Sequence, residues 1–203
     1  MPGRQPMLPD ARSDGRAAAL PGEHCDGAAL ALPADTMLTR LVSYMDDRGM
    51  VSEIFRSSWT SGIEPVQWST CISRPAVLRG VHVHIRHDDY LCVIQGRVLV
   101  ALCDLRRGSP TERMATTLEM TGEELSSLFI PHGVAHGFYA YESSTYVLGT
   151  SHYYDVDDEL GCHWGDPELG LSWPIASPDL SARDAALGTL EELLPRIRPW
   201  RHA

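Results

Sequence analysis

The sequence lacks three features that would assign a protein class at once: a long apolar run, paired cysteines and an excess of positive charge. No apolar run approaches the roughly 20 residues that a membrane-spanning helix needs. The five cysteines are widely spaced and form no CxxC pair, so neither a disulfide framework nor a zinc knuckle is indicated. The formal net charge of -10 argues against nucleic acid and membranes as partners. These absences favour a cytoplasmic protein with reduced thiols, in which an anionic ligand would need a local cluster of arginines.

The chain of 203 residues is long enough for one domain with a sizeable core. Residues 1–34 are rich in Ala, Gly, Pro and Asp without a sustained period, which predicts a flexible N-terminal extension. Residues 35–203 contain many short strand-like runs, separated by turn residues such as Asp47-Arg48-Gly49 and Gln95-Gly96. This spacing predicts an all-β domain, an antiparallel sandwich or barrel. One short helix is expected at residues 181–194, opened by Ser181 as its N-cap.

Histidines gather in the segment "RGVHVHIRHDD", directly after a strand-like run. Residues two apart on a strand share a face, so His82 and His84 are expected to point the same way. His136, at the start of a later strand, could join them if that face lines a barrel interior. Such imidazoles would either move protons or hold a metal. His87 and Asp88 are expected in a solvated turn, and the acidic run at 154–161 is expected to be a solvated loop.

The spacing of these residues resembles a known signature. H-x-H, then a carboxylate, then Gly runs through His82, His84, Asp89 and Gly96, and "PHGVAH" supplies P-x-G-x-x-H, ending at His136. This resembles the two-part motif of the cupin superfamily, in which three histidines and one carboxylate bind a divalent ion inside a small β-barrel. The resemblance implies a transition metal, Fe, Mn, Ni, Cu or Zn, held by His82, His84, Asp89 and His136. Asp89 stands where Glu is usual and is one methylene shorter.

A second resemblance covers the chain from about Met37 to Leu194. The blocks that carry it are "DDRGMVSEIF", "LRGVH", "IPHGVAHGFYAYES", "GDPELGLSWP" and "LSARD". They stand in the order expected of dTDP-4-dehydrorhamnose 3,5-epimerases and related sugar 3-epimerases. The resemblance implies a cupin-type β-sandwich or jelly-roll barrel and a homodimer. It also implies an isomerase of deoxysugar biosynthesis that enolises a 4-keto-6-deoxyhexose nucleotide, dTDP-linked, without a cofactor.

The resemblance also implies roles for single residues. His82 would be the general base that removes a proton next to the keto group, and Asp184 the carboxylate that orients it. Hydrogen bonding to one ring nitrogen fixes the tautomer and stabilises the imidazolium. The implied substrate-binding residues are Arg48, Glu53, Gln67, Arg79 and His136. The arginines would supply the positive charge that a diphosphate needs.

Two positions depart from the family. A lysine that polarises the keto oxygen is replaced by Asp89, and a tyrosine that acts as general acid aligns with Leu148. Tyr146, two residues away on the same strand face, is a candidate substitute. Removal of the proton is therefore conserved in this chain, whereas stabilisation of the enolate and its reprotonation are not assigned.

Three functions follow from these patterns. The first is a divergent 3-epimerase or 3,5-epimerase, recruited to specialised metabolism. The second is a metal-dependent cupin enzyme, an oxygenase, lyase or cyclase, acting on another small molecule. The third is a binding protein that keeps the pocket without the chemistry. A metal could take over the task of the lysine, because a Lewis acid stabilises a developing enolate. His82 cannot easily be a ligand and a free base at once, and as a ligand it would be oriented by Asp184.

Overall fold

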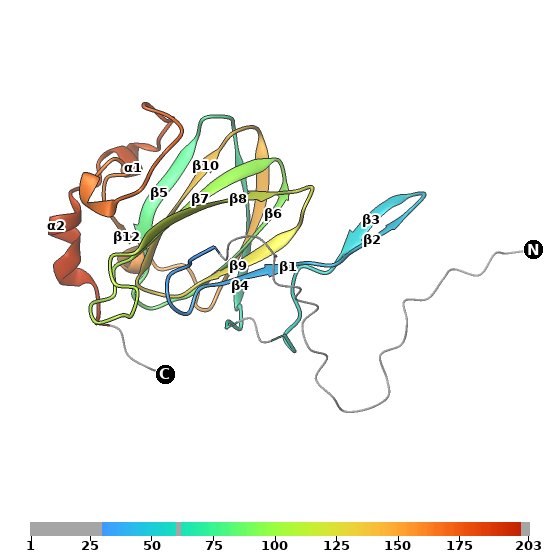
Figure 1. Ribbon diagram of the computed structural model, residues 1–203, viewed down its shortest axis with the longest axis horizontal. Helices are drawn as coiled ribbons and strands as arrows, with labels where there is room; N and C mark the ends of the chain where they lie inside the picture. Colours follow the sequence, from blue (N-terminus) through green and yellow to red (C-terminus); the bar gives the residue numbers. More distant parts are fainter. Residues whose placement is uncertain (1–29, 60–61, 200–203) are drawn as a thin grey trace, which may run out of the picture.

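Two five-stranded antiparallel sheets form the body of the protein in the computed structural model, which describes residues 30–59 and 62–199 (Figure 1). The first sheet has the order β1-β9-β6-β11-β4, with β1 at Met37–Arg40, β4 at Gln67–Ser73, β6 at Asp89–Gln95, β9 at Ser126–Ile130 and β11 at Ser144–Thr150. The second has the order β12-β5-β10-β7-β8, with β5 at Leu78–Val83, β7 at Arg97–Asp104, β8 at Ala115–Thr121, β10 at Val134–Ala140 and β12 at Leu160–Gly161. The predicted all-β sandwich is confirmed.

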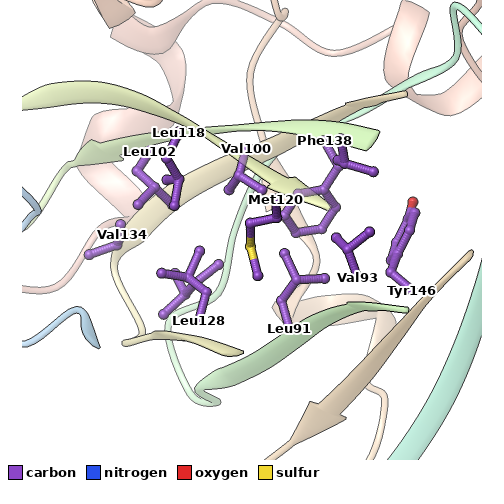
Figure 2. Packing of buried hydrophobic residues seen from close by; sticks show 12 residues of the cluster. Leu91, Val93, Val100, Leu102, Leu118, Met120, Leu128, Val134, Phe138 and Tyr146 are labelled. Atoms are coloured by element: carbon purple, nitrogen blue, oxygen red, sulfur yellow. The ribbon is translucent and has the colours of Figure 1, made fainter. Parts of the chain in front are cut away.

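The main core lies between the two sheets (Figure 2). Leu91 and Leu128 of the first sheet and Val100 and Leu102 of the second are all fully buried. These side chains alternate along their strands, as expected where one face of each sheet packs against the other. Burial of a side chain of this size contributes about 1.5–3 kcal/mol to folding. The apolar interior therefore stabilises the sandwich. Polar groups can then lie at one end of that interior.

Both predicted turns are confirmed. Gly96 joins β6 to β7 with a φ of +78°, and a Cβ there would lie 2.6 Å from the carbonyl oxygen of Ser143. Asp47 and Arg48 join β2 (Ser43–Asp46) to β3 (Gly49–Ser52) in a separate two-stranded hairpin. Figure 1 shows this hairpin projecting from the sandwich, and we call residues 43–52 the arm.

The C-terminal segment packs on the outer face of the second sheet. The single helix expected at 181–194 is wrong, because the structure has two short helices, α1 at Ala182–Ala185 and α2 at Leu190–Leu193. The carbonyl of Gly188 accepts a hydrogen bond from His163, and Thr189 caps a new helix, so the first cannot continue. The predicted Ser181 cap is confirmed. Single-turn 3₁₀ helices lie at Val156–Asp158, Pro167–Leu169 and Leu194–Arg196.

The N-terminal extension predicted for residues 1–34 falls mainly on residues 1–29, which lie outside the described residues. Its last residues contact the sandwich. Leu32 packs against the main core, and the Ala34 amide donates a 2.7 Å hydrogen bond to the Thr111 hydroxyl. Arg106 donates to the Ala34 carbonyl at 2.6 Å and contacts Asp35 at 2.9 Å. Across the described ranges, the structure has no helix with the length and apolarity that a membrane crossing requires.

Candidate active site

A cavity of about 590 Å³ lies between the sheets, walled by β4, β6 and β11 on one side and by β5 and β10 on the other. A volume of this size suits a small-molecule ligand. Its walls contain most of the candidate residues named from the sequence. They include His82, His84, Asp89, His136, Arg79 and Asp184.

The predicted base and its partner are in contact. His82 Nε2 lies 2.7 Å from Asp184 Oδ1, although the two residues are 102 positions apart in the chain. Asp184 sits in the first turn of α1, where its amide donates to the Ser181 hydroxyl, and its side chain is almost fully buried. Burial would raise the pKa of Asp184, but hydrogen bonding to His82 outweighs that effect and holds the pKa below its usual range. An ionised Asp184 fixes the proton of His82 on Nε2 and leaves Nδ1 as the basic nitrogen.

Gly80 lets the strand that carries His82 pack closely. Its φ is +121°, and a Cβ there would lie 2.8 Å from the Cα of Gly137 on β10. The Gly80 amide also donates to Asp184 Oδ2 at 3.4 Å. The glycine of the "RGVH" segment therefore has two tasks, close contact between β5 and β10 and a second hydrogen bond to the carboxylate that orients His82.

A second group of ionisable side chains converges in the same cavity. Asp89 Oδ2 lies 3.4 Å from His84 Nε2 and 3.5 Å from His136 Nε2, and all three residues are buried. His84 follows β5, His136 lies on β10 and Asp89 begins β6, so the group joins the two sheets. Three of the four implied metal ligands are thus brought together. The fourth, His82, is directed to Asp184 and does not belong to the group.

Burial controls the ionisation of this group. It lowers the pKa of His84 to about 3, and the neighbouring charge of His87 adds to the effect. Burial likewise puts the pKa of His136 well below its usual range. Burial, together with the negative charges of Glu159, Asp88 and Asp158, raises the pKa of Asp89 well above its usual range. Without a cation, each of the three side chains therefore favours its neutral form.

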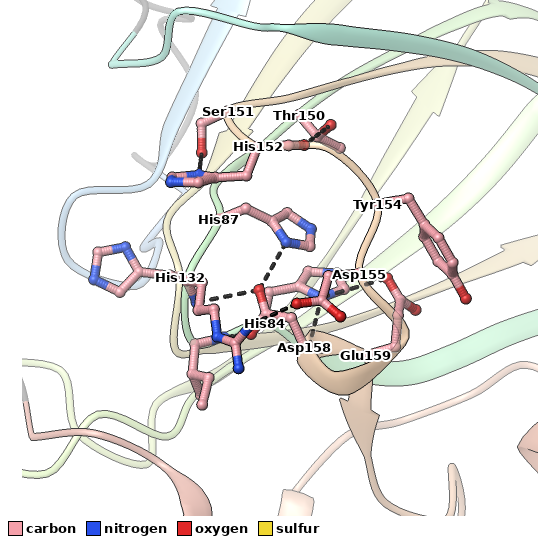
Figure 3. A network of polar contacts seen from close by, with 12 residues as sticks. His84, His87, His132, Thr150, Ser151, His152, Tyr154, Asp155, Asp158 and Glu159 are labelled. Atoms are coloured by element: carbon pink, nitrogen blue, oxygen red, sulfur yellow. Dashed lines mark hydrogen bonds and ion pairs between the residues drawn. The ribbon is translucent and has the colours of Figure 1, made fainter.

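The expectation of a solvated turn is wrong for His87, which is buried and lines the cavity. Its ring stacks on His84 with a centroid distance of 3.8 Å, and its Nδ1 lies 2.8 Å from Asp158 Oδ2 (Figure 3). The expectation of a solvated acidic loop is also wrong for Asp158, which accepts hydrogen bonds from the Ile85 and Arg86 amides. Nothing local in the sequence signals this contact, because His87 and Asp158 are 71 residues apart.

The implied substrate-binding residues divide into two groups. Gln67 and Arg79 line the cavity, as His136 does. Arg79 Nε donates to the Ser73 hydroxyl at 3.0 Å, which holds its guanidinium beside the cavity. Arg48 lies in the arm and Glu53 directly follows it. Neither residue lines the cavity of its own chain. They form exposed ion pairs with Asp46 and Arg56, respectively.

The two candidates for the missing tyrosine both line the cavity from β11. Leu148 has no group that could carry a proton, whereas Tyr146 is buried with its hydroxyl 3.1 Å from Ser73 Oγ. Burial raises the pKa of Tyr146, so its phenol stays protonated at neutral pH. Ser73 in turn accepts from Arg79, which links the phenol to a cation through one hydroxyl.

A family model described as dTDP-4-dehydrorhamnose 3,5-epimerase matches residues 31–192. The chain belongs to this family. This epimerase-family protein is 32% identical over 160 residues to the dTDP-4-dehydrorhamnose 3,5-epimerase of Neisseria gonorrhoeae, covering 75% of the chain but 49%, about half, of that relative. Its identity to the enzyme of that name from Shigella flexneri is 29% over 162 residues, covering 74% of the chain and 88% of the relative.

A solved structure extends the likeness of this epimerase-family protein to three dimensions. The dTDP-6-deoxy-D-glucose-3,5-epimerase of Legionella pneumophila Philadelphia 1, in complex with dTDP-4-keto-L-rhamnose, matches with a TM-score of 0.76 at 29% identity. The match covers 83% of this chain and 94% of that structure. The implied family, an isomerase family of deoxysugar biosynthesis, and the implied sandwich fold are therefore confirmed.

Proposed function

We propose that this protein epimerises a 4-keto-6-deoxyhexose nucleotide, dTDP-linked, at C3 or at C3 and C5. The observation that carries the proposal is the 2.7 Å contact between His82 and Asp184 in the wall of the cavity. The Legionella relative, with dTDP-4-keto-L-rhamnose bound, supports the class of substrate. As a family member with a changed lysine and tyrosine, the protein suits a role in specialised metabolism.

The reaction needs a base next to an acidified carbon. A proton on the carbon beside the 4-keto group is acidic, because its departure leaves an enolate with the charge on oxygen. His82 Nδ1 would accept this proton, and Asp184 would stabilise the resulting imidazolium through Nε2. A positioned base of this kind contributes about 10²–10⁴-fold to a rate. Return of the proton to the opposite face inverts the carbon, and Tyr146 is the protonated group on β11 proposed to donate it.

Arginine would provide the positive charge for the diphosphate. The chain carries a net charge of -10, so an anionic ligand depends on a local cation. Arg79 is exposed at the cavity, with its guanidinium held by the Ser73 hydroxyl and the Ile72 carbonyl. Gln67, whose side-chain oxygen accepts from the Tyr154 amide, lies on the same wall. A planar guanidinium binds two phosphate oxygens at once, which favours arginine over a flexible cation.

We further propose a homodimer in which the arm reaches the cavity of a second copy. The arm exposes apolar side chains, with Met45 74% and Val51 62% accessible. The strand β4 is the last strand of its sheet and exposes Ile72, which also borders the cavity. Apolar surface on a projecting hairpin and on a free sheet edge is costly to leave in water. Docking of the arm there would bring Arg48 and Glu53 to the partner's cavity.

We propose that the reaction takes place in the cytoplasm. Cys71, Cys92, Cys103 and Cys162 are all free thiols, and burial raises the pKa of Cys92 and Cys103 to about 11. Unpaired buried thiols suit a reducing compartment.

Deuterium exchange tests the activity. In D₂O, the wild-type protein is expected to place deuterium at C3 of a dTDP-4-keto-6-deoxyhexose, followed by NMR, and His82→Asn is expected to abolish it. Unchanged exchange in His82→Asn, or no exchange and no nucleotide-sugar binding by the wild type, would contradict the proposal. The second outcome would favour the alternative function, a metal-dependent cupin enzyme acting on another small molecule, which the group of His84, Asp89 and His136 supports.

Complementation tests the dimer. Arg48→Ala and His82→Asn are each expected to be inactive as pure dimers. If one site uses His82 of one copy and Arg48 of the other, subunit exchange restores one intact site in each mixed dimer. Random mixing then returns about a quarter of the wild-type activity. No recovery, in a mixture that size-exclusion chromatography with light scattering shows to be dimeric, would contradict a shared site.

A further inference from the structure

Asp89 has a buried oxygen atom that lacks a hydrogen-bond partner. Among the described residues, Asp89 Oδ2 is one of two buried side-chain oxygen or nitrogen atoms in this condition. The side chain is 7% exposed and lines the cavity. Leaving such an atom unpaired costs about 1–3 kcal/mol, and more if it is charged. The position of Asp89 therefore demands a cation or a proton.

The two neighbouring histidines offer lone pairs to this oxygen. The Nδ1 of His84 lies 3.2 Å from the Asp158 carbonyl, and the Nδ1 of His136 lies 3.2 Å from the Val134 carbonyl. A carbonyl only accepts, so each Nδ1 carries the proton and donates it, and each Nε2 presents a lone pair. Both Nε2 atoms face Asp89 Oδ2. Three acceptors thus point at one another in a buried space. Backbone carbonyls that orient imidazoles in this way are usual around metal ions.

The distances from Asp89 Oδ2 to the two histidines are compatible with three ligands of one metal ion. Two ligand atoms that each lie about 2.1 Å from a tetrahedral ion are about 3.4 Å apart. The measured separations from Asp89 Oδ2 are 3.4 Å to His84 and 3.5 Å to His136. A hydrogen bond through a proton on Asp89 would instead draw the atoms to about 2.7 Å.

The lysine expected at position 89 has no substitute elsewhere in the sequence. All 17 basic residues counted as Lys or Arg are arginines, so the chain contains no lysine at all. Arg183, which lies in α1 and lines the cavity, forms an ion pair with Glu159 at 3.1 Å. The reaction proposed above develops negative charge on the keto oxygen, and a positive group is needed there. A divalent ion on Asp89 would place positive charge at the position from which the lysine has been lost.

We propose that His84, Asp89 and His136 bind one divalent transition metal ion, which would supply positive charge beside the 4-keto oxygen of the sugar. This inference rests on the proposed epimerisation. His82 would remove the proton, and the electron pair of the C–H bond would move to the C4 oxygen. Return of a proton to carbon restores the ketone, so no oxidant or reductant is consumed. Because His82 is directed to Asp184 and is not a ligand, base and ion act side by side.

His87 lies next to this site as a further nitrogen. Its Nδ1 is held by Asp158, and its Nε2 is 3.6 Å from Asp89 Oδ1. Two imidazoles and one carboxylate form a set that suits iron, zinc, manganese or nickel and leaves positions open. Binding of the ion would use the Nε2 lone pairs of His84 and His136, whose Nδ1 atoms donate to backbone carbonyls.

Metal content tests the inference. Tag-free, full-length protein, reconstituted separately with Zn²⁺, Mn²⁺, Ni²⁺, Co²⁺ and anaerobic Fe²⁺, is expected to retain about one equivalent of at least one ion after desalting, measured by mass spectrometry. Co²⁺ should give visible d–d absorption that differs from that of the aqueous ion. His84→Ala and Asp89→Asn are expected to lose both signals. His163→Ala, which removes a histidine outside the cavity, should keep them, as should His82→Asn.

Circular dichroism of each variant separates loss of the site from loss of the fold. No retained ion in the wild type, or equal retention in folded His84→Ala and Asp89→Asn, would overturn the metal site. If such a protein still exchanges deuterium through His82, only the metal inference fails. If an ion is retained but no nucleotide sugar binds, the metal site is supported and its proposed role in epimerisation is refuted. Asp89→Lys, which restores the family residue, should lose the ion, and retention of one equivalent by the folded variant would also overturn the metal site.

Discussion

Replacement of Asp184 by Asn isolates the contribution of the carboxylate to proton removal. Asp184→Asn keeps the size of the side chain and the possibility of a hydrogen bond at the 2.7 Å contact, but removes the charge that faces His82. When His82 accepts a proton, this contact becomes a hydrogen bond between two charged groups. Hydrogen bonds to charged groups contribute about 1.5–3 kcal/mol, which corresponds to a loss of about 10-fold to about 150-fold in rate.

The loss should appear in kcat, because Asp184 acts through His82, while KM stays near the wild-type value. The assay is deuterium incorporation at C3 in D₂O, followed by NMR at saturating substrate. His82→Asn is expected to lose more, about 10²–10⁴-fold, and the double variant should be no slower than His82→Asn. Exchange by Asp184→Asn within twofold of wild type, with the protein folded, would refute the role assigned to the carboxylate. A double variant much slower than His82→Asn would do the same.

Three further predictions concern other parts of the fold. Tyr146→Phe should slow formation of the epimer about 10²-fold while deuterium exchange into recovered substrate continues, because the variant removes only the proton donor on the opposite face. Equal loss of epimer formation and of deuterium exchange would contradict the role of Tyr146 as that donor. Asp104→Asn should destabilise the protein by about 1.5–3 kcal/mol in urea denaturation, because it removes the buried carboxylate 2.9 Å from Arg106 and leaves that guanidinium with the more exposed Asp35. Burial would raise the pKa of Asp104, but hydrogen bonds from Arg106, Ser109 and Thr111 outweigh that effect and lower the pKa below 3.8. The stabilisation by Asp104 is therefore complete at neutral pH and is lost as the pH falls through the lowered pKa. Wild-type stability that does not change between pH 6 and the acid range would contradict this prediction. Leu128→Ala, between the sheets, should cost about 2–5 kcal/mol by the same measurement, and a cost under about 1 kcal/mol would mean that the site collapses freely.

Much of the fold follows from local patterns. Alternation and turn residues predict the strands and the hairpin at Gly96, because a strand with one buried face has a period of two. The same reasoning does not predict the break between the two helices at Gly188. Most residues of the segment 181–194 favour helix, but α1 ends at Ala185, and the Gly188 carbonyl accepts a hydrogen bond from a distant amide, that of His163. The helix propensities of single residues carry no information about that long-range contact.

The candidate site shows the same division. The face shared by His82 and His84 is a local property of a strand, yet the two side chains serve different partners, Asp184 and Asp89. The alternation of a strand sets the face of a residue but not the partner it meets there. The turn around His87 predicts a solvated side chain, whereas its burial depends on Asp158, which lies 71 residues away in the chain. Sites assembled from distant loops leave no periodic signal in the sequence.

The projecting arm has a consequence for how activity would depend on protein concentration. If the active site takes Arg48 from a second copy, as proposed, it would exist only in the associated protein, and dissociation would remove the diphosphate contact while His82 remained. Dilution through the dissociation constant of the dimer would then raise the apparent KM and lower the turnover per chain, with a lag on reconcentration set by the association rate. High substrate would in turn hold the two copies together, since a ligand bound by both favours the pair. Expression level would thereby set the specific activity of the protein as well as its amount.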